Sequence, residues 1–332
     1  MKLSILDQSP VSNGMSATQA LHNTITLAQE AEKLGYYRFW VSEHHNSDSL
    51  AGSSPEVLIS AIAAKTENIR VGSGGVMLPH YSAYKVAENF AVLQSLFPDR
   101  IDLGIGRAPG GMPLATMALQ ENASRDIRDY PNQIDDVADY LHGRTEHHRF
   151  QGLKATPQPE TSPELWLLGS SGSSASVAAE KGAGFSFAHF INPIGGPQVM
   201  NTYLQAFTPS HISQKPANSV AVFAVCAETE EEAERLASSL DLSILLIETG
   251  KSRNGIPSVE QAESFPYTPF DREHIANNRG RIIVGTPAKV KAQIERLARA
   301  YQTDEVVIVS IIHEFEAKLQ SYRLIADAFR GE

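Results

Sequence analysis

The chain has 332 residues, of which 42% are hydrophobic and 20% charged. This composition is typical of a globular enzyme and excludes a disordered chain or a membrane-embedded one. The formal net charge of -10 repels phosphate backbones and anionic lipid headgroups, so neither nucleic acid nor a membrane surface is expected as a partner. The length fits one large α/β barrel, and we expect a single domain over residues 1–332.

The N-terminal residues and the single cysteine indicate the cellular compartment in which the protein is expected. Cys226 is the only cysteine and lies in an apolar run, so it is interpreted as core packing and cannot form an intrachain disulfide. The apolar run Leu3–Leu6 is interrupted at once by Asp7, which argues against a signal peptide. We therefore expect a cytoplasmic protein.

Short β-rich runs alternate with helical-period segments along the whole chain, which predicts repeated βα units around a parallel sheet. The predicted strands are Leu3–Asp7, Tyr36–Val41, Ile69–Gly72, Ile101–Ile105, Leu165–Leu168, Gly184–Phe187, Val220–Val225 and Glu305–Ser310. The predicted helices are Thr18–Leu34, Pro55–Thr66, Ser82–Phe97, Asp126–Leu141, Ala175–Lys181, Pro197–Phe207, Glu230–Ile247 and Glu314–Phe329. This pattern predicts a (β/α)₈ TIM barrel. An open doubly wound sheet is the rival, but no GxGxxG follows the first strand.

Two long insertions interrupt the pattern. The segment Gly106–Arg125 after the fourth strand is predicted to be irregular. A second irregular stretch, Thr249–Gly280, precedes the run Arg281–Gly285 and a helix over Pro287–Tyr301. Such insertions usually form lids or functional loops.

His44 follows the second predicted strand, at the end where barrel enzymes build their active sites. An imidazole suits general acid or base catalysis. A structural role or metal ligation is the alternative, although adjacent strand positions point His44 and His45 to opposite faces. Glu43 is interpreted as orienting a neighbour.

Three further loops follow predicted strands. Gly74 and Gly75 permit unusual dihedrals or close approach of a flat ligand, a plain turn being the alternative. Arg107 suits a phosphate or carboxylate, unless it pairs with an acid such as Asp102. The hydroxyl-rich turn Ser170–Ser174 opens directly into a helix and predicts an anion site. A ligand with a flat head and a phosphate tail fits this set.

A metal-dependent hydrolase is disfavoured in spite of eleven histidines, because the sequence lacks clear ligand spacing. His147 and His148 lie in a charged loop, and His189 and His313 follow strands without acidic partners beside them. No metal is expected.

Motifs spread over nearly the whole chain resemble the bacterial luciferase-like, flavin-dependent monooxygenase family. They are SEHHN (42–46), VGSGGVMLP (71–79), RIDLGIGRAPG (100–110), LLGSSGSSASVAAEKG (167–182) and IIVGTPAKV (282–290).

The resemblance implies roles for individual residues. The family's non-proline cis peptide corresponds to Gly74-Gly75, and its catalytic histidine to His44. The reactive cysteine of the luciferases corresponds to Gly106, which argues against light emission. The implied phosphate site comprises Arg107, Ser171 and Ser174 with the amides of Gly172 and Ser173, next to Ser170, and Arg125 as a second cation.

The resemblance also implies an activity: a monooxygenase that takes reduced FMN from a separate flavin reductase and uses O₂ on a small organic substrate. An F420-dependent hydride-transfer enzyme and a flavin-binding protein without turnover are the alternatives. Pairing of relatives through the second and third helices implies a homodimer.

Overall fold

The computed structural model describes residues 1–121, 126–251 and 255–330. Within them, parallel strands close into a barrel in the order β10-β1-β2-β3-β5-β6-β7-β8, with β10 pairing both β1 and β8. The strands of this ring are β1 Lys2–Asp7, β2 Arg38–Val41, β3 Arg70–Ser73, β5 Ile101–Gly106, β6 Glu164–Gly169, β7 Gly184–Ala188, β8 Asn218–Cys226 and β10 Glu305–Val309. The predicted barrel is confirmed and the open sheet is wrong.

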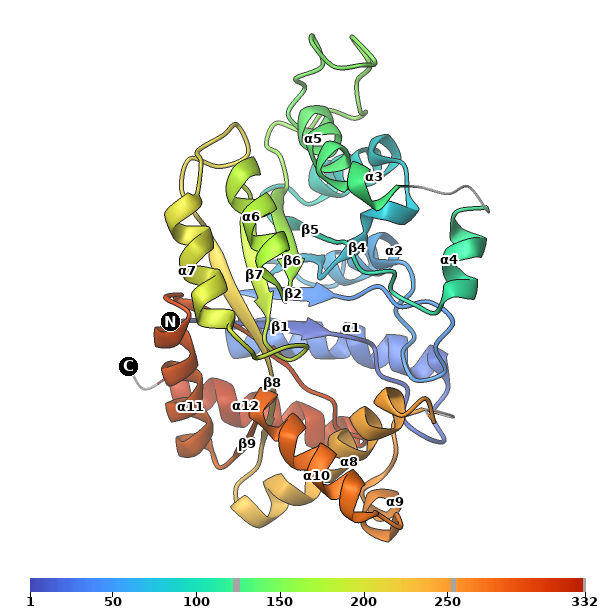
Figure 1. The fold of residues 1–332 in the computed structure, drawn as a ribbon, viewed down its shortest axis with the longest axis vertical. Coiled ribbons are helices and arrows are strands. Elements are labelled where there is room, and N and C mark those ends of the chain that lie inside the picture. The colour runs from blue at the N-terminus through green and yellow to red at the C-terminus, as the bar shows by residue number, and fades with distance from the viewer. Residues whose placement is uncertain (122–125, 252–254, 331–332) are drawn as a thin grey trace.

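Helices surround this barrel (Figure 1) and follow its strands in the predicted order. They are α1 Ala17–Leu34, α2 Pro55–Ala63, α3 Ala83–Leu96, α5 Tyr130–Leu141, α6 Gly172–Lys181, α7 Gly196–Ala206, α8 Glu230–Glu248 and α12 Phe315–Phe329. None of the helices in the described part of the chain has the length and apolarity needed to cross a membrane.

Two predicted helix starts are wrong. α5 begins at Tyr130 and not at Asp126, because Pro131 occupies its first turn, where a missing N–H costs no hydrogen bond. α6 begins at Gly172 and not at Ala175, because Ser171 has the extended conformation of an N-cap.

The insertions contain more regular structure than predicted. The segment after β5 holds α4 (Pro113–Leu119), and the stretch after α8 holds α9 (Val259–Ser264) and α10 (Pro269–Asn278). Capping boxes at Ser258 and Thr268 start these last two helices. The further elements are β4 Val76–Met77, the 3₁₀ turns Leu78–His80, Ile127–Asp129 and Arg279–Arg281, β9 Ile282–Gly285 and α11 Pro287–Ala300.

Strand β8 has two different partners on one edge. Its first half, Val220–Phe223, pairs with β10, whereas its second half, Phe223–Cys226, pairs with β9. β9 therefore lies beside the ring near the C-terminal ends of the strands and anchors the second insertion there.

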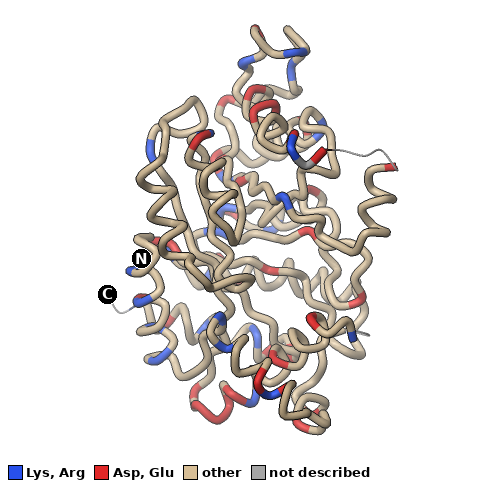
Figure 2. The backbone as a smooth tube through the Cα atoms, in the orientation of Figure 1, with Lys and Arg blue, Asp and Glu red and all other residues tan. Residues whose placement is uncertain are grey.

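Apolar side chains fill both faces of the barrel wall, as expected for parallel strands covered by helices. Along β1, Ile5 packs in the larger cluster with the surrounding helices, whereas Leu6 packs with Trp40, Trp166 and Val307 in a second cluster. Charged residues of both signs are distributed along the whole chain (Figure 2), and the first turn of α8 is acidic.

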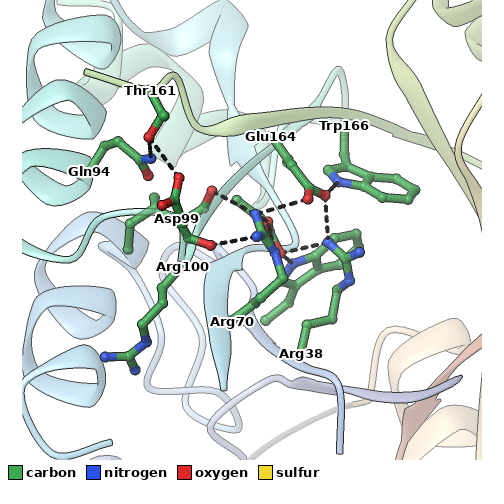
Figure 3. Close-up of polar contacts among 12 residues, drawn as sticks. Arg38, Arg70, Gln94, Asp99, Arg100, Thr161, Glu164 and Trp166 are labelled. Atoms are coloured by element: carbon green, nitrogen blue, oxygen red, sulfur yellow. Dashed lines mark hydrogen bonds and ion pairs between the residues drawn. The ribbon is translucent and has the colours of Figure 1, made fainter. Parts of the chain in front are cut away.

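An ionic network closes the N-terminal end of the barrel (Figure 3). Asp102 accepts hydrogen bonds from Arg38 at 2.7 Å, Arg70 at 2.5 Å and the Trp40 indole at 2.9 Å. Glu164 joins the same network through Arg38, at 3.3 Å. The alternative that Arg107 pairs with Asp102 is wrong, because Asp102 is the second residue of β5, whereas Arg107 follows the other end of this strand and donates to Ser173.

Candidate active site

A cavity of about 330 Å³ opens at the C-terminal ends of the strands, the end that carries active sites in TIM barrels. Most of the predicted site residues line it together: His44, Gly74, Gly75, Gly106, Arg107, Ser170, Ser171 and Ser174. Gly172 and Ser173 form the first turn of α6 beside it. Arg125 lies outside the described residues.

Glycines form the floor of this cavity. The Gly74-Gly75 peptide is cis, as the resemblance implied. A Cβ at Gly75 would lie 2.7 Å from the Gly104 carbonyl oxygen, and one at Gly74 would lie 2.7 Å from Leu6 Cδ1. Larger residues are therefore excluded, and the floor is free of side chains from these two positions.

The start of α6 presents hydrogen-bond donors at one end of the cavity. Ser171 is the N-cap residue, yet its side chain makes no capping hydrogen bond, so the hydroxyl is available to a ligand. Arg107 is exposed, and its Nη1 donates to Ser173 Oγ at 3.3 Å. Unpaired N–H groups, the helix dipole and the guanidinium together favour an anion here.

His44 faces the same cavity as a neutral group. Burial, followed by the neighbouring His45, lowers its pKa from 6.5 to about 4. Its Nδ1 lies 3.0 Å from the Ser42 hydroxyl, which fixes the ring. At pH 7 the imidazole is therefore neutral and can form hydrogen bonds with a ligand in the cavity.

Glu43 holds the loop on which both histidines lie. Its carboxylate is fully buried and accepts hydrogen bonds from His45 Nε2 at 2.7 Å, the Tyr81 hydroxyl at 2.8 Å and the Met77 amide at 3.0 Å. Burial and then Glu43 raise the pKa of Tyr81, which keeps the phenol protonated. The interpretation of Glu43 as an orienting residue agrees with these contacts.

Sequence reasoning missed several residues of the site. Gln8, Ser42 and Met77 line the cavity, and Tyr81 supports it through Glu43. Gln8 directly follows β1, so the rule that singled out His44 at a strand end would also have found Gln8. Met77 and Tyr81 follow the glycine pair and gave no separate signal.

Three of the four histidines considered as metal ligands have individual partners. His148 Nε2 bonds Asp136 at 2.7 Å, His189 contacts the Tyr301 hydroxyl at 2.9 Å, and His313 lies 2.9 Å from Glu314. The prediction that His313 lacks an acidic partner is wrong. Within the described ranges, no three His, Cys, Asp or Glu side chains gather closely enough to hold a metal ion.

Comparisons with known proteins agree with this geometry. The model of the family described as luciferase-like monooxygenase matches residues 1–304. The uncharacterized protein YwcH of Bacillus subtilis is 56% identical, with 99% of both chains covered. The N-acetyl-S-alkylcysteine monooxygenase of the same organism is 40% identical, covering 99% of this chain and 98% of its own.

Solved structures give the same result. The apo-MsnO8 crystal structure superposes with a TM-score of 0.91 at 38% identity, covering 99% of this chain and 98% of that one. The oxygenating constituent of 3,6-diketocamphane monooxygenase from Pseudomonas putida, in complex with FMN, shares the fold with a TM-score of 0.72 at 20% identity, over 99% and 97% of the chains. The protein described here therefore belongs to the luciferase-like monooxygenase family.

Proposed function

We propose that the protein is a monooxygenase that uses reduced FMN and O₂ to oxygenate a small organic substrate. The observation that carries this proposal is one cavity that joins a glycine floor to an anion site. Each turnover consumes substrate, O₂ and reduced FMN, and yields oxygenated substrate, FMN and water. Family membership, together with the FMN complex of a structural neighbour, supports the choice of cofactor.

The donors present fit the proposed cofactor. The Ser171 hydroxyl without a capping bond, the exposed Arg107 and the first amides of α6 would hold the phosphate. The Gly74-Gly75 floor leaves room for a flat ring above it. Bound FMN supplies the redox chemistry with O₂, and the protein supplies position and a secluded cavity.

His44 is the residue that we assign to proton handling. Ser42 orients its ring through Nδ1, which leaves Nε2 as the nitrogen available to a ligand. A bound anion nearby would raise the pKa of this imidazole from about 4 and so let it accept a proton more readily. Glu43 keeps the loop in place while this happens.

The test is flavin binding. Dissociation constants for reduced and oxidised FMN would be measured anaerobically for the wild type, Arg107→Ala and Ser171→Ala. We expect reduced FMN to bind at micromolar strength and each variant to lose about tenfold or more, roughly 1.4 kcal/mol. Arg299→Ala, which removes an exposed cation far along the chain on α11, serves as the control and should bind as the wild type does.

Two alternatives are resolved in the same experiment. Tight binding of F420 without binding of FMN would replace oxygenation by hydride transfer. FMN binding with no NADH-driven O₂ consumption, in the presence of a flavin reductase, would indicate a binding protein without oxygen chemistry. If neither cofactor binds, the proposed function fails.

A further inference from the structure

A second cavity adjoins the candidate active-site cavity, in which we propose that FMN binds and which we call the flavin cavity. Its volume is about 620 Å³, within the range of about 300–1,000 Å³ that is usual for small-molecule sites. The two cavities share five lining residues: Gln8, His44, Gly110, Phe190 and Ile191. We call the second one the outer chamber and the shared residues the junction.

The outer chamber has an apolar wall. The second half of α8 contributes Leu240, Ile244 and Ile247, and the facing parts of the chain contribute further large apolar side chains. Four of them are Phe190, Phe223, Ile256 and Ile311. Leu240 and Ile256 are almost completely buried, so this wall is part of the packed core and is preformed. Burial of an apolar ligand against such a surface removes apolar area from water and so favours binding.

The charged groups of the chamber give little attraction to an anion. Of the described side chains, Asp48, Glu248 and Arg281 are the charged ones that line it. Arg281 already donates to Glu248 at 2.5 Å and to the Ile191 carbonyl at 3.0 Å. The remaining nitrogen, Nε, has no partner but is buried, so an anionic group would meet a guanidinium already paired with Glu248, together with two carboxylates.

The junction carries hydrogen-bonding groups that the described part of the protein leaves available. The half-buried Gln8 amide has no hydrogen-bond partner among the described residues, and neither has His44 Nε2. A carboxamide and a neutral imidazole bind an uncharged polar atom, such as a carbonyl oxygen. They lie where a ligand of the outer chamber would meet the flavin cavity.

We infer that the outer chamber is the substrate site and that it takes an uncharged molecule with an apolar body and one hydrogen-bonding group, which Gln8 positions at the junction. This inference rests on the proposed function for the chemistry that follows binding. It does not need the flavin for binding itself.

The test uses a series of 2-alkanones as probes. Displacement of the neutral dye Nile red from the full-length protein, with and without FMN, would give dissociation constants for 2-pentanone to 2-undecanone. We expect the affinity to rise about fourfold per added methylene until the chamber is full. Nonanoate should bind about tenfold or more weakly than 2-nonanone, because its charge must be desolvated without a free partner.

Two variants test whether the probes bind in the outer chamber. Ile247→Asp places a charge in the wall at a side chain that is 55% exposed, so folding should survive, and 2-nonanone should bind about tenfold more weakly. Leu153→Asp, at a partly exposed apolar residue that lines neither cavity, is the matched control and should change nothing.

Gln8→Leu distinguishes positioning from packing. Loss of one hydrogen bond should weaken every ketone by about fivefold while the gain per methylene stays the same. A purely structural role of Gln8 would change that gain as well.

Affinities independent of chain length, nonanoate binding as tightly as 2-nonanone, or an Ile247→Asp variant that binds as the wild type would each overturn the inference. Because the flavin affinity is measured separately, failure of FMN binding with intact ketone binding would refute the proposed function and leave the chamber standing.

Discussion

Arg38 and Asp102, 64 positions apart, form a hydrogen-bonded ion pair of 2.7 Å at the N-terminal end of the barrel. Their side chains are 2% and 0% exposed, and the pair connects β2 to β5 past the intervening β3. Arg38 also binds Glu305 of β10 and Glu164 of β6, so one side chain links four strands of the ring, β2 included. These residues lie at the starts of their strands, whereas the candidate active-site cavity lies at the strand ends, so we assign the network to stability.

Removal of Arg38 should destabilise the fold strongly. Arg38→Ala leaves buried carboxylates with one cation fewer, and we expect the free energy of unfolding to fall by about 3–5 kcal/mol. Chemical denaturation measures the loss. Lys85→Ala breaks a solvent-exposed pair with Glu88, and should cost less than about 1 kcal/mol. Equal losses in the two variants would contradict the assignment.

Two glycines of β5 should respond differently to the same substitution. A Cβ at Gly104 would overlap the Ser73 carbonyl, which belongs to the backbone of β3 and cannot easily move. A Cβ at Gly106 would lie 2.7 Å from Met77 Cε, the flexible end of a side chain. We expect Gly104→Ala to cost about 1–3 kcal/mol or more in unfolding free energy, and Gly106→Ala to cost less than about 1 kcal/mol.

The same pair of variants tests the cavity. Because Gly106 lines the flavin cavity, the added methyl group should weaken FMN binding even though the fold is intact. Denaturation curves and flavin titrations on both proteins provide the check. A stable Gly104→Ala protein would show that β3 and β5 can separate locally.

His44 should make stability depend on pH. Its pKa is about 4 in the folded chain and 6.5 in the unfolded chain, so unfolding between these values takes up a proton. Stability is then fully present above pH 6.5 and decreases as the pH falls toward 4. In His44→Gln, urea unfolding at pH 7, 6 and 5 should show a shallower decrease. His142, whose pKa is also lowered to about 4 by burial, remains in the variant and supplies part of the residual slope. If the free energy of unfolding fell equally with pH in the two proteins, His44 would not be a cause of the pH dependence.

The proposed homodimer has a testable surface. Val57 on α2 is 72% exposed, and Leu96 on α3 is 61% exposed, while these two helices contact each other. Burial of such side chains against a second copy would be favourable. We expect the wild type to sediment as a dimer and Val57→Asp/Leu96→Asp to shift it toward the monomer. Phe270→Asp, at a 68% exposed residue of α10, should leave the mass unchanged. A monomeric wild type would rule out the dimer.

The strands and the main helices could be predicted because their apolar period is regular and their ends carry local signals. Gly35 ends α1 with a φ of 82°, for example, as its position after the predicted helix suggested. Once the strands are predicted, the residues at their ends can be predicted as neighbours, because the C-terminal ends of the strands of a parallel barrel converge. That reasoning brought His44, Gly75, Arg107 and Ser171 to one cavity.

The features of the fold and of the candidate site that could not be predicted depend on tertiary contacts. The short helices α4, α9 and α10 were missed because Pro and Gly punctuation outweighs their brief apolar periods, and α10 has no buried residue at all. The low pKa of His44 follows from burial, which the sequence position does not reveal. The partners of Glu43 come from β4 and from the loop after it, and only the folded chain brings them together.

Because β8 pairs with β10 along its first half and with β9 along its second half, closure of the ring and attachment of the second insertion depend on different parts of one strand. Because β10 closes the ring on the first half of β8, circular closure does not depend on β9 or on the insertion that β9 anchors. The insertion can thus vary in length and sequence, during evolution or in a designed chimera, while the ring keeps its register and the glycine floor keeps its place. In such a barrel, exchange of this one insertion can change which ligands are bound.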